Sequence, residues 1–245
     1  MGSSRLLLIR FCATLFLLGA AVLTSSFSGV APRANAHNTS TAIPPNFIIT
    51  TQTNLVSDVP GVAFIQDRLL TNPWGIAAGP NMPFCVVNSG GSSASLYQGD
   101  VAGGPLVPNP GLSSIAILPP ETVVPIAVQA TAVAANTTNS FSVSLTPTSP
   151  AAPAQFIFVT RNGAINGWQP AMGAVATVQR FVAGHSYTGV TIATNGSGNF
   201  LLAADFTNGK IDVFDNNFNP TSLSGNFSDP TIPLSFHPFN IWIIQ

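Results

Sequence analysis

Ionisable side chains are scarce in this sequence, which has 7 Lys and Arg and 8 Asp and Glu among its 245 residues. A nucleic-acid partner or an anionic membrane surface requires Lys and Arg gathered in a patch. No such cluster exists, so the sequence argues against both. Disorder is disfavoured because 46% of the residues are hydrophobic. Together with 21 Gly and 21 Pro, this composition is typical of an all-β protein with many tight turns.

Cysteine is equally rare, since the sequence contains only Cys12 and Cys85. Cys12 lies in an N-terminal segment that we expect to be removed, which leaves one cysteine in the mature chain. A single cysteine cannot form a disulfide within its own chain, so core packing must supply the stability. Cys85 lies in the apolar stretch "FCVVN". We therefore interpret it as a buried small hydrophobe and not as a reactive thiol.

The N-terminus has the organisation of a secretory signal peptide. Arg5 and Arg10 give it a basic start, and an apolar run follows over residues 11–23. This run is too short to span a membrane, and no longer one follows it. Residues 34–36 read "ANA", the small-x-small form that signal peptidase recognises. We therefore expect residues 1–36 to be removed, no membrane insertion, and a secreted, extracytoplasmic protein.

His37 would then be the first residue of the mature chain, at the start of a flexible segment over residues 37–50. An N-terminal histidine can chelate copper with its amine and its ring. That chemistry would also need a second imidazole, from His185 or His237. We do not favour a copper site, because His37 begins a segment with nothing to hold it in place.

No amphipathic helix is evident after residue 50. Short apolar segments rich in β-branched and aromatic residues alternate with Gly, Pro, Asn and Asp, which predicts strands joined by turns. The predicted strands cover residues 84–87, 94–97, 113–118, 132–135, 155–159, 164–168, 177–182, 190–193, 200–204, 210–214 and 241–244.

The predicted strands recur in a fixed order. Each unit opens with an inner strand, reading "PWGIAA", "ATAVAA", "YTGVTIA" and "PFNIWII" in turn, and further strands follow it. Four-stranded units of about 40–50 residues are typical of propeller blades. We therefore predict an all-β fold over residues 51–245, a β-propeller of the six-bladed, NHL- and lactonase-like type with three to four blades present. A segment rich in Pro, Ser and Thr over residues 101–153 is interpreted as an insertion.

Several motifs follow one another along the chain: "NPWGIA" at 72–77, "FIFVTRNGAINGW" at 156–168, "YTGVTIA" at 187–193, "AADFTNGKIDVFD" at 203–215 and "PFNI" at 238–241. In this order they resemble a family of exported, functionally uncharacterised bacterial proteins with a propeller-like repeat. The resemblance implies that family members continue beyond "PFNI", so that this chain looks like a C-terminally truncated member. Its last apolar run would then be an open strand edge, through which we expect aggregation or oligomerisation.

Asp205, Asp212 and Asp215 fall close together in "LLAADFTNGKIDVFD". Carboxylates are ligands for calcium, and Asp205 and Asp212 could approach each other across a tight Asn-Gly hairpin. The interpretation that we favour is that they are solvated acids at strand ends, and not a metal site. The equivalents of Asp205 in the other units, Asn88 and Thr160, are polar without being acidic.

The sequence contains no nucleophile elbow, phosphate loop or paired-cysteine zinc motif. Lactonase-type propellers hold calcium with Glu, Asn and Asp from inner strands, whereas the inner strands here read "WGIAA", "TAVAA" and "GVTIA". We therefore expect a non-enzymatic binding or scaffold module for a protein or a glycan, with no catalytic residue and no cofactor. A lactonase- or esterase-type hydrolase with a metal site at the channel mouth stays open as the alternative.

Overall fold

A computed structural model describes residues 52–99, 104–121, 128–225, 227, 229–233 and 235–243. The signal peptide expected over residues 1–36 and the flexible segment expected over 37–50 lie outside the described residues. Within the described part of the chain, no helix is long and apolar enough to cross a membrane.

The described residues form an all-β structure, as predicted, with a single short 3-10 turn, Pro170–Met172 (η1). The strands are Val56–Ser57 (β1), Ile65–Gln66 (β2), Pro73–Ala77 (β3), Phe84–Asn88 (β4), Ser93–Gln98 (β5), Val107–Pro108 (β6), Ser114–Ile117 (β7), Ala130–Ala135 (β8), Ser142–Val143 (β9), Ala152–Pro153 (β10), Phe156–Thr160 (β11), Ala164–Trp168 (β12), Val175–Phe181 (β13), Tyr187–Asn195 (β14), Gly198–Asp205 (β15), Lys210–Phe214 (β16) and Pro220–Thr221 (β17).

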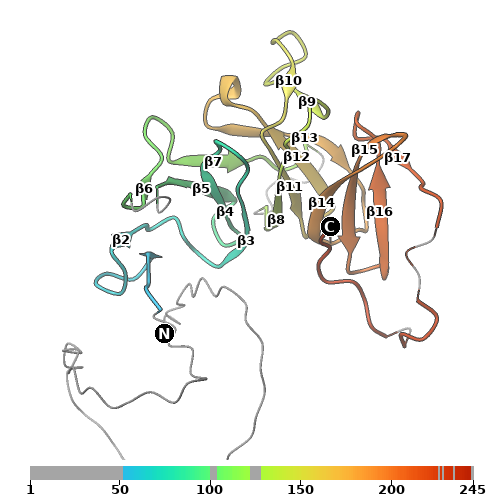
Figure 1. Cartoon of the computed structure of the whole chain (residues 1–245), viewed down its shortest axis with the longest axis horizontal. Helices are drawn as coiled ribbons and strands as arrows, with labels where there is room; N and C mark the ends of the chain where they lie inside the picture. The colour runs from blue at the N-terminus through green and yellow to red at the C-terminus, as the bar shows by residue number, and fades with distance from the viewer. Residues whose placement is uncertain are drawn as a thin grey trace, which may run out of the picture. The chain divides into compact units, whose positions relative to one another are not determined.

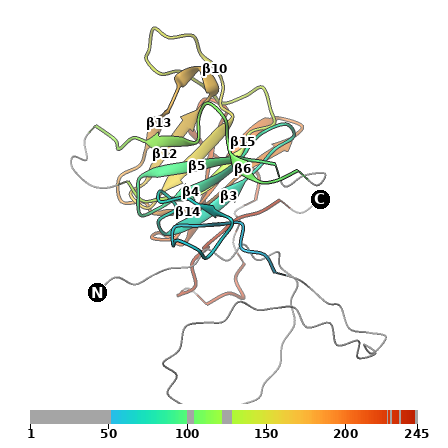
Figure 2. The same ribbon diagram turned by 90° about the vertical axis from the view of Figure 1, so that its left-hand side faces the viewer.

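Three antiparallel groups of four strands follow one another along the chain: β3-β4-β5-β7, β8-β11-β12-β13 and β14-β15-β16-β17. They lie side by side across Figure 1, and in Figure 2 the first group faces the viewer. The outer strands of the first two groups, β7 and β13, pair in parallel and join these groups into one sheet. The segment predicted as an insertion over residues 101–153 contains β7 and β8 as well as the short β6, β9 and β10.

The first strands of the three groups lie in a row, with β8 between β3 and β14. A Cβ atom built on Gly75 of β3 would lie 2.9 Å from the Cα of Ala132 in β8. This contact brings the two ends of the large sheet together into a nearly closed, barrel-like arrangement. On the other side of β8, the hydroxyl of Thr131 donates a hydrogen bond to the carbonyl of Tyr187 in β14 (2.6 Å).

Two hairpins form where Asn-Gly pairs predict them. Gly163 lies between β11 and β12 and Gly209 between β15 and β16, with φ angles of 83° and 65°. Glycine takes such angles without steric cost, which is why this pair closes tight hairpins. Strand β11 of the first hairpin lies in the core, and residues 156–159 are fully buried. Since successive side chains point to opposite faces, both faces of the sheet are covered here.

The prediction of a strand over residues 241–244 is wrong for residues 241–243, which belong to no strand. Residue 244 lies outside the described residues. A strand needs a neighbour that pairs with its backbone. This segment instead packs by close approach: a Cβ on Gly189 of β14 would lie 2.6 Å from the Cα of Asn240. Apolar character alone, without a partner ladder, does not make a strand.

Candidate functional site

Two of the three candidate acids lie on one face of the β15–β16 hairpin. Asp205 ends β15 opposite Lys210, and Asp212 lies in β16 opposite Ala203. Side chains at alternate positions of a strand point to the same side. The hairpin therefore brings Asp205, Lys210 and Asp212 to a common face, as the sequence suggested for the two acids.

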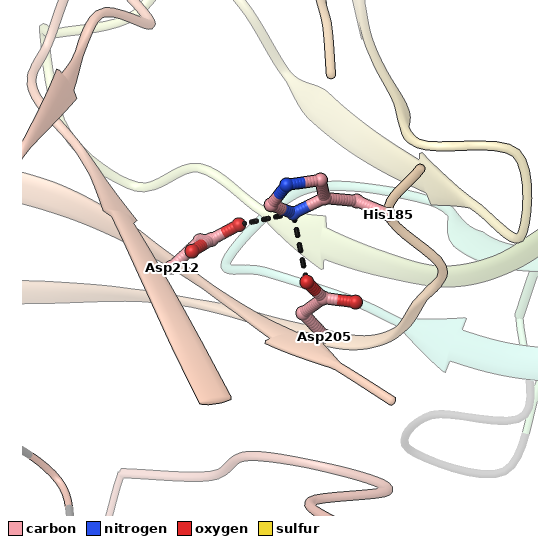
Figure 3. A group of neighbouring side chains, drawn as sticks. All are labelled: His185, Asp205 and Asp212. Atoms are coloured by element: carbon pink, nitrogen blue, oxygen red, sulfur yellow. Dashed lines mark hydrogen bonds and ion pairs between the residues drawn. The ribbon is translucent and has the colours of Figure 1, made fainter. Parts of the chain in front are cut away.

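His185 completes a cluster with these two acids. It lies in the turn before β14, where its backbone N–H donates to the carbonyl of Val182 (3.3 Å). Its ring Nδ1 lies 2.7 Å from Oδ2 of Asp205 and 2.8 Å from Oδ2 of Asp212. Figure 3 shows both carboxylates converging on this one nitrogen, while the other ring nitrogen points away from them.

Asp205 is fully buried, and both of its carboxylate oxygens accept hydrogen bonds. Its Oδ1 accepts hydrogen bonds from the backbone N–H groups of Ser186 (3.1 Å) and Asn208 (3.4 Å). Its Oδ2 accepts from the side-chain amide of Asn208 (2.6 Å). The expectation that this strand-end acid is solvated is therefore wrong: the turn before β14 covers it. The equivalent strand-end residues Asn88 and Thr160 are also fully buried.

Asp212 is bound on its two oxygens by different donors. The hydroxyl of Tyr187 donates to Oδ2 (2.9 Å), the oxygen that faces His185. The ammonium group of Lys210 lies 2.9 Å from the outer oxygen, Oδ1. Burial raises the pKa of Tyr187, and the nearby charge of Asp212 raises it further. The tyrosine hydroxyl therefore stays protonated and acts as a donor to the carboxylate.

Asp215, the third candidate acid, does not join the cluster. Its Oδ1 accepts hydrogen bonds from the backbone N–H groups of Asn217 and Asn219, at 2.8 Å each. Desolvation raises the pKa of Asp215, but these two hydrogen bonds outweigh it and hold the pKa below its ordinary value. The bond from Asn219 has the larger effect of the two. Its role in the structure is to shape the turn between β16 and β17.

A cavity of about 400 Å³ adjoins the cluster. His185, Asp212 and Lys210 contribute to its polar side, and Phe214 and Leu223 are among its apolar lining. The side chains of His185 and Asp212 are part-exposed, at 17% and 16%. The cluster therefore combines one buried acid with two groups that a solute can reach.

Sequence reasoning missed His185 as a partner of these acids and considered it only beside His37. His185 stands two residues before Tyr187, at the start of a predicted inner strand, and this position alone does not indicate the two acids. In the structure Tyr187 pairs with Asp205 across β14 and β15, and this pairing sets the imidazole beside the strand-end acid.

Comparison with known proteins adds one relative. No protein-family model matches the sequence, and no solved structure matches it. The chain is 28% identical over 196 residues to Uncharacterized protein R648 of Acanthamoeba polyphaga mimivirus, an alignment that covers 76% of this chain and 44% of that protein. The chain thus spans less than half the length of this relative.

Proposed function

We propose that this chain is part of an exported β-propeller of the six-bladed, NHL- and lactonase-like type, which acts as a binding module for a protein or a glycan. The signal-peptide pattern supports export, and the order of the strands supports the propeller. Each four-stranded group runs from an inner strand outward, as a blade does, and the groups succeed one another without an α-helix among the described residues.

Contacts between inner strands support a radial arrangement. Gly75 and Ala132, which approach each other, hold the same position in the repeats "WGIA" and "TAVA". Gly189 and Asn240, which also approach each other, hold that position in "TGV" and "FNI". Equivalent residues of successive repeats touch when the repeats are arranged around a common axis. The residues 238–241 would then mark where the next inner strand runs.

The observation that carries the binding function is an exposed aromatic patch formed by Trp74, Phe206, His237 and Phe239. The ring centroids of Trp74 and Phe239 lie 5.8 Å apart, and those of Phe206 and Phe239 lie 6.1 Å apart. His237 packs edge-on against Phe206. The exposed fractions of Trp74, Phe206 and Phe239 are 41%, 45% and 56%.

These aromatic residues come from strand β3, from the loop after β15 and from the segment before residue 240, so the fold gathers them from distant parts of the sequence. Contiguous exposed apolar surface of this kind marks interaction sites. Aromatic rings supply large contact areas to a ligand at low entropic cost. By contrast the side chain of Trp168 is buried in the core.

The alternative, a lactonase- or esterase-type hydrolase, receives less support. Such propellers place metal ligands on inner strands. β3, β8 and β14 contain no Asp, Glu or His, and their one Asn, Asn195, lies at the exposed end of β14. The His185 cluster lies instead at the end of the third group of strands, outside these three strands.

A glycan array and a displayed peptide library, both probed with the full-length secreted protein, test the binding function. We expect a defined set of ligands whose affinity falls at least about tenfold in Trp74→Ala, since truncating an aromatic anchor costs about 2 kcal/mol or more. Phe64→Ala is the matched control, because Phe64 is 82% exposed and lies outside the patch. Equal loss in both variants, or turnover of lactone or ester substrates without ligand binding, would contradict the proposal.

A further inference from the structure

We propose that His185, Asp205 and Asp212 bind one divalent transition-metal ion, of which Zn²⁺ is the representative. One ligand atom from each residue lies within 4.8 Å of the other two. Within the described residues this is the one group of three or more His, Cys, Asp or Glu side chains that meets this condition. The inference does not depend on the binding function proposed for the aromatic patch.

The number of hydrogens at Nδ1 of His185 is the first argument. This nitrogen carries at most one hydrogen, yet carboxylate oxygens lie 2.7 and 2.8 Å away from it on two different residues. One hydrogen cannot make full hydrogen bonds to both oxygens at once. A cation among the three atoms satisfies the lone pairs of all of them. Any proton on Nδ1 is then released to solvent, as metal binding to imidazole requires.

The partners of the two carboxylates are the second argument. Asn208 and the backbone N–H of Ser186 fix Asp205, and the hydroxyl of Tyr187 fixes Asp212. Outer hydrogen bonds of this kind orient the ligands of metal sites. Lys210 binds Oδ1 of Asp212, so it does not occupy Oδ2, the oxygen that faces His185 and would bind the metal ion.

The donor set selects the class of metal. Calcium and magnesium prefer oxygen ligands alone, whereas an imidazole nitrogen suits zinc and its neighbours. One nitrogen and two carboxylate oxygens, with a fourth position open, is a set that zinc accepts. The cavity of about 400 Å³ beside His185 and Asp212 has room for a fourth ligand, a water molecule or a group of a bound solute.

Metal entry requires a small adjustment. Zinc lies about 2.0–2.2 Å from nitrogen and oxygen ligands, which puts tetrahedral ligand atoms about 3.4 Å apart. Nδ1 of His185 lies 2.7 and 2.8 Å from the two carboxylate oxygens, so each of these distances has to lengthen by about 0.6–0.7 Å. His185 lies in a turn and the side chain of Asp212 is part-exposed, so these two residues can move while the buried Asp205 stays fixed.

The test uses the full-length secreted protein without a histidine tag, stripped with a chelator. Titration calorimetry with Zn²⁺ should give one site per chain, and Co²⁺ should give visible absorption bands of low-symmetry coordination. His185→Gln and Asp212→Asn should each weaken Zn²⁺ binding at least about tenfold and remove the Co²⁺ bands. Asp215→Asn and His237→Gln are the controls, since both change the same residue types outside the cluster and should leave the site intact.

Several outcomes would overturn the proposal. The first is a wild-type protein that binds no Zn²⁺, and the second is Zn²⁺ binding that survives unchanged in His185→Gln and Asp212→Asn. Such binding would report other ligands, such as an N-terminal His37. Circular dichroism shows whether each variant folds; if one does not, the other decides, because either ligand is required.

Discussion

Asp205 is the one carboxylate among the described residues that is fully buried. Burying an ionised carboxylate is costly unless partners compensate it. Here an imidazole and three N–H donors surround it. In the other two groups of strands the neutral residues Asn88 and Thr160 fill the same position, so the hairpin itself does not require an acid. The contact with His185 therefore explains why position 205 carries an acid.

Substitutions of Asp205 and Asp215 compare a fully buried acid with a part-exposed one. Asp205→Ala should lower the free energy of unfolding by about 3–5 kcal/mol, because it leaves His185 and the buried N–H donors without their partner. Asp215→Ala should cost about 1 kcal/mol, the value of its turn hydrogen bonds. Urea unfolding followed by tryptophan fluorescence measures both. Two equally small effects would restore the interpretation that both acids are solvated.

Tyr97 gives a prediction for alkaline pH. Burial raises its pKa, and its hydrogen bond to Asp67 raises it further. The folded state thus favours the neutral hydroxyl. The resulting stability is fully present below the unfolded pKa of about 10 and is lost as pH rises above it.

The sequence has two tyrosines, so Tyr187→Phe leaves Tyr97 alone for spectroscopy. Absorbance at 295 nm should show no tyrosinate near pH 10 in the folded protein, and it should rise together with alkaline unfolding seen by circular dichroism. Tyrosinate that forms near pH 10 while the protein stays folded would show that Tyr97 is accessible to solvent.

At the scale of elements, local signals predicted most of the strands. β12 and β16 span residues 164–168 and 210–214, as predicted. Both strands could be predicted because alternating side chains and an Asn-Gly turn are local sequence patterns. The strand expected at 241–244 failed because strand formation depends on a neighbour that is distant in sequence. The parallel pairing of β7 with β13 has the same origin and carries no local signature.

The cluster shows the same division between local and distant information. Asp205 and Asp212 could be brought together from the sequence, because one hairpin contains both. His185 could not, because its place depends on how β14 pairs with β15 and on a register shift between Tyr187 and Gly189. The sequence of a turn does not show which distant residues the turn will contact once the strands have paired.

Contact between inner strands predicts the effect of added volume. Gly75→Ala places a methyl group 2.9 Å from the backbone of β8 and should destabilise the fold by about 1–3 kcal/mol, as overpacking does. Gly196→Ala is the matched control, because nothing lies within 4 Å of its Cβ position. Chemical denaturation of both variants provides the measurement. A Gly75→Ala protein as stable as the control would show that β3 and β8 are not in close contact.

At the scale of the whole molecule, few charges and many apolar strands produce an extended all-β core. Its main cluster contains buried residues from all three groups of strands, among them Cys85 in β4, Phe156 in β11 and Leu201 in β15, and a smaller second cluster contains Val86 and Tyr97. Composition predicted this class of fold directly. How the three groups of strands are arranged depends on contacts between β3, β8 and β14, which composition does not encode. The exposed aromatic patch and the His185 cluster likewise arise only when separate groups of strands or turns are brought together.

The arrangement of inner strands around a common axis is the central claim, and solution NMR tests it most directly. In a labelled sample, nuclear Overhauser effects should connect the backbone protons of Gly75 with those of Ala132, and those of Gly189 with those of Asn240, since each pair is in close contact. Cross-peaks for both pairs are the predicted result. If β3 and β8 are each folded but the Gly75–Ala132 cross-peak is absent, the inner strands do not lie side by side and the propeller arrangement is wrong.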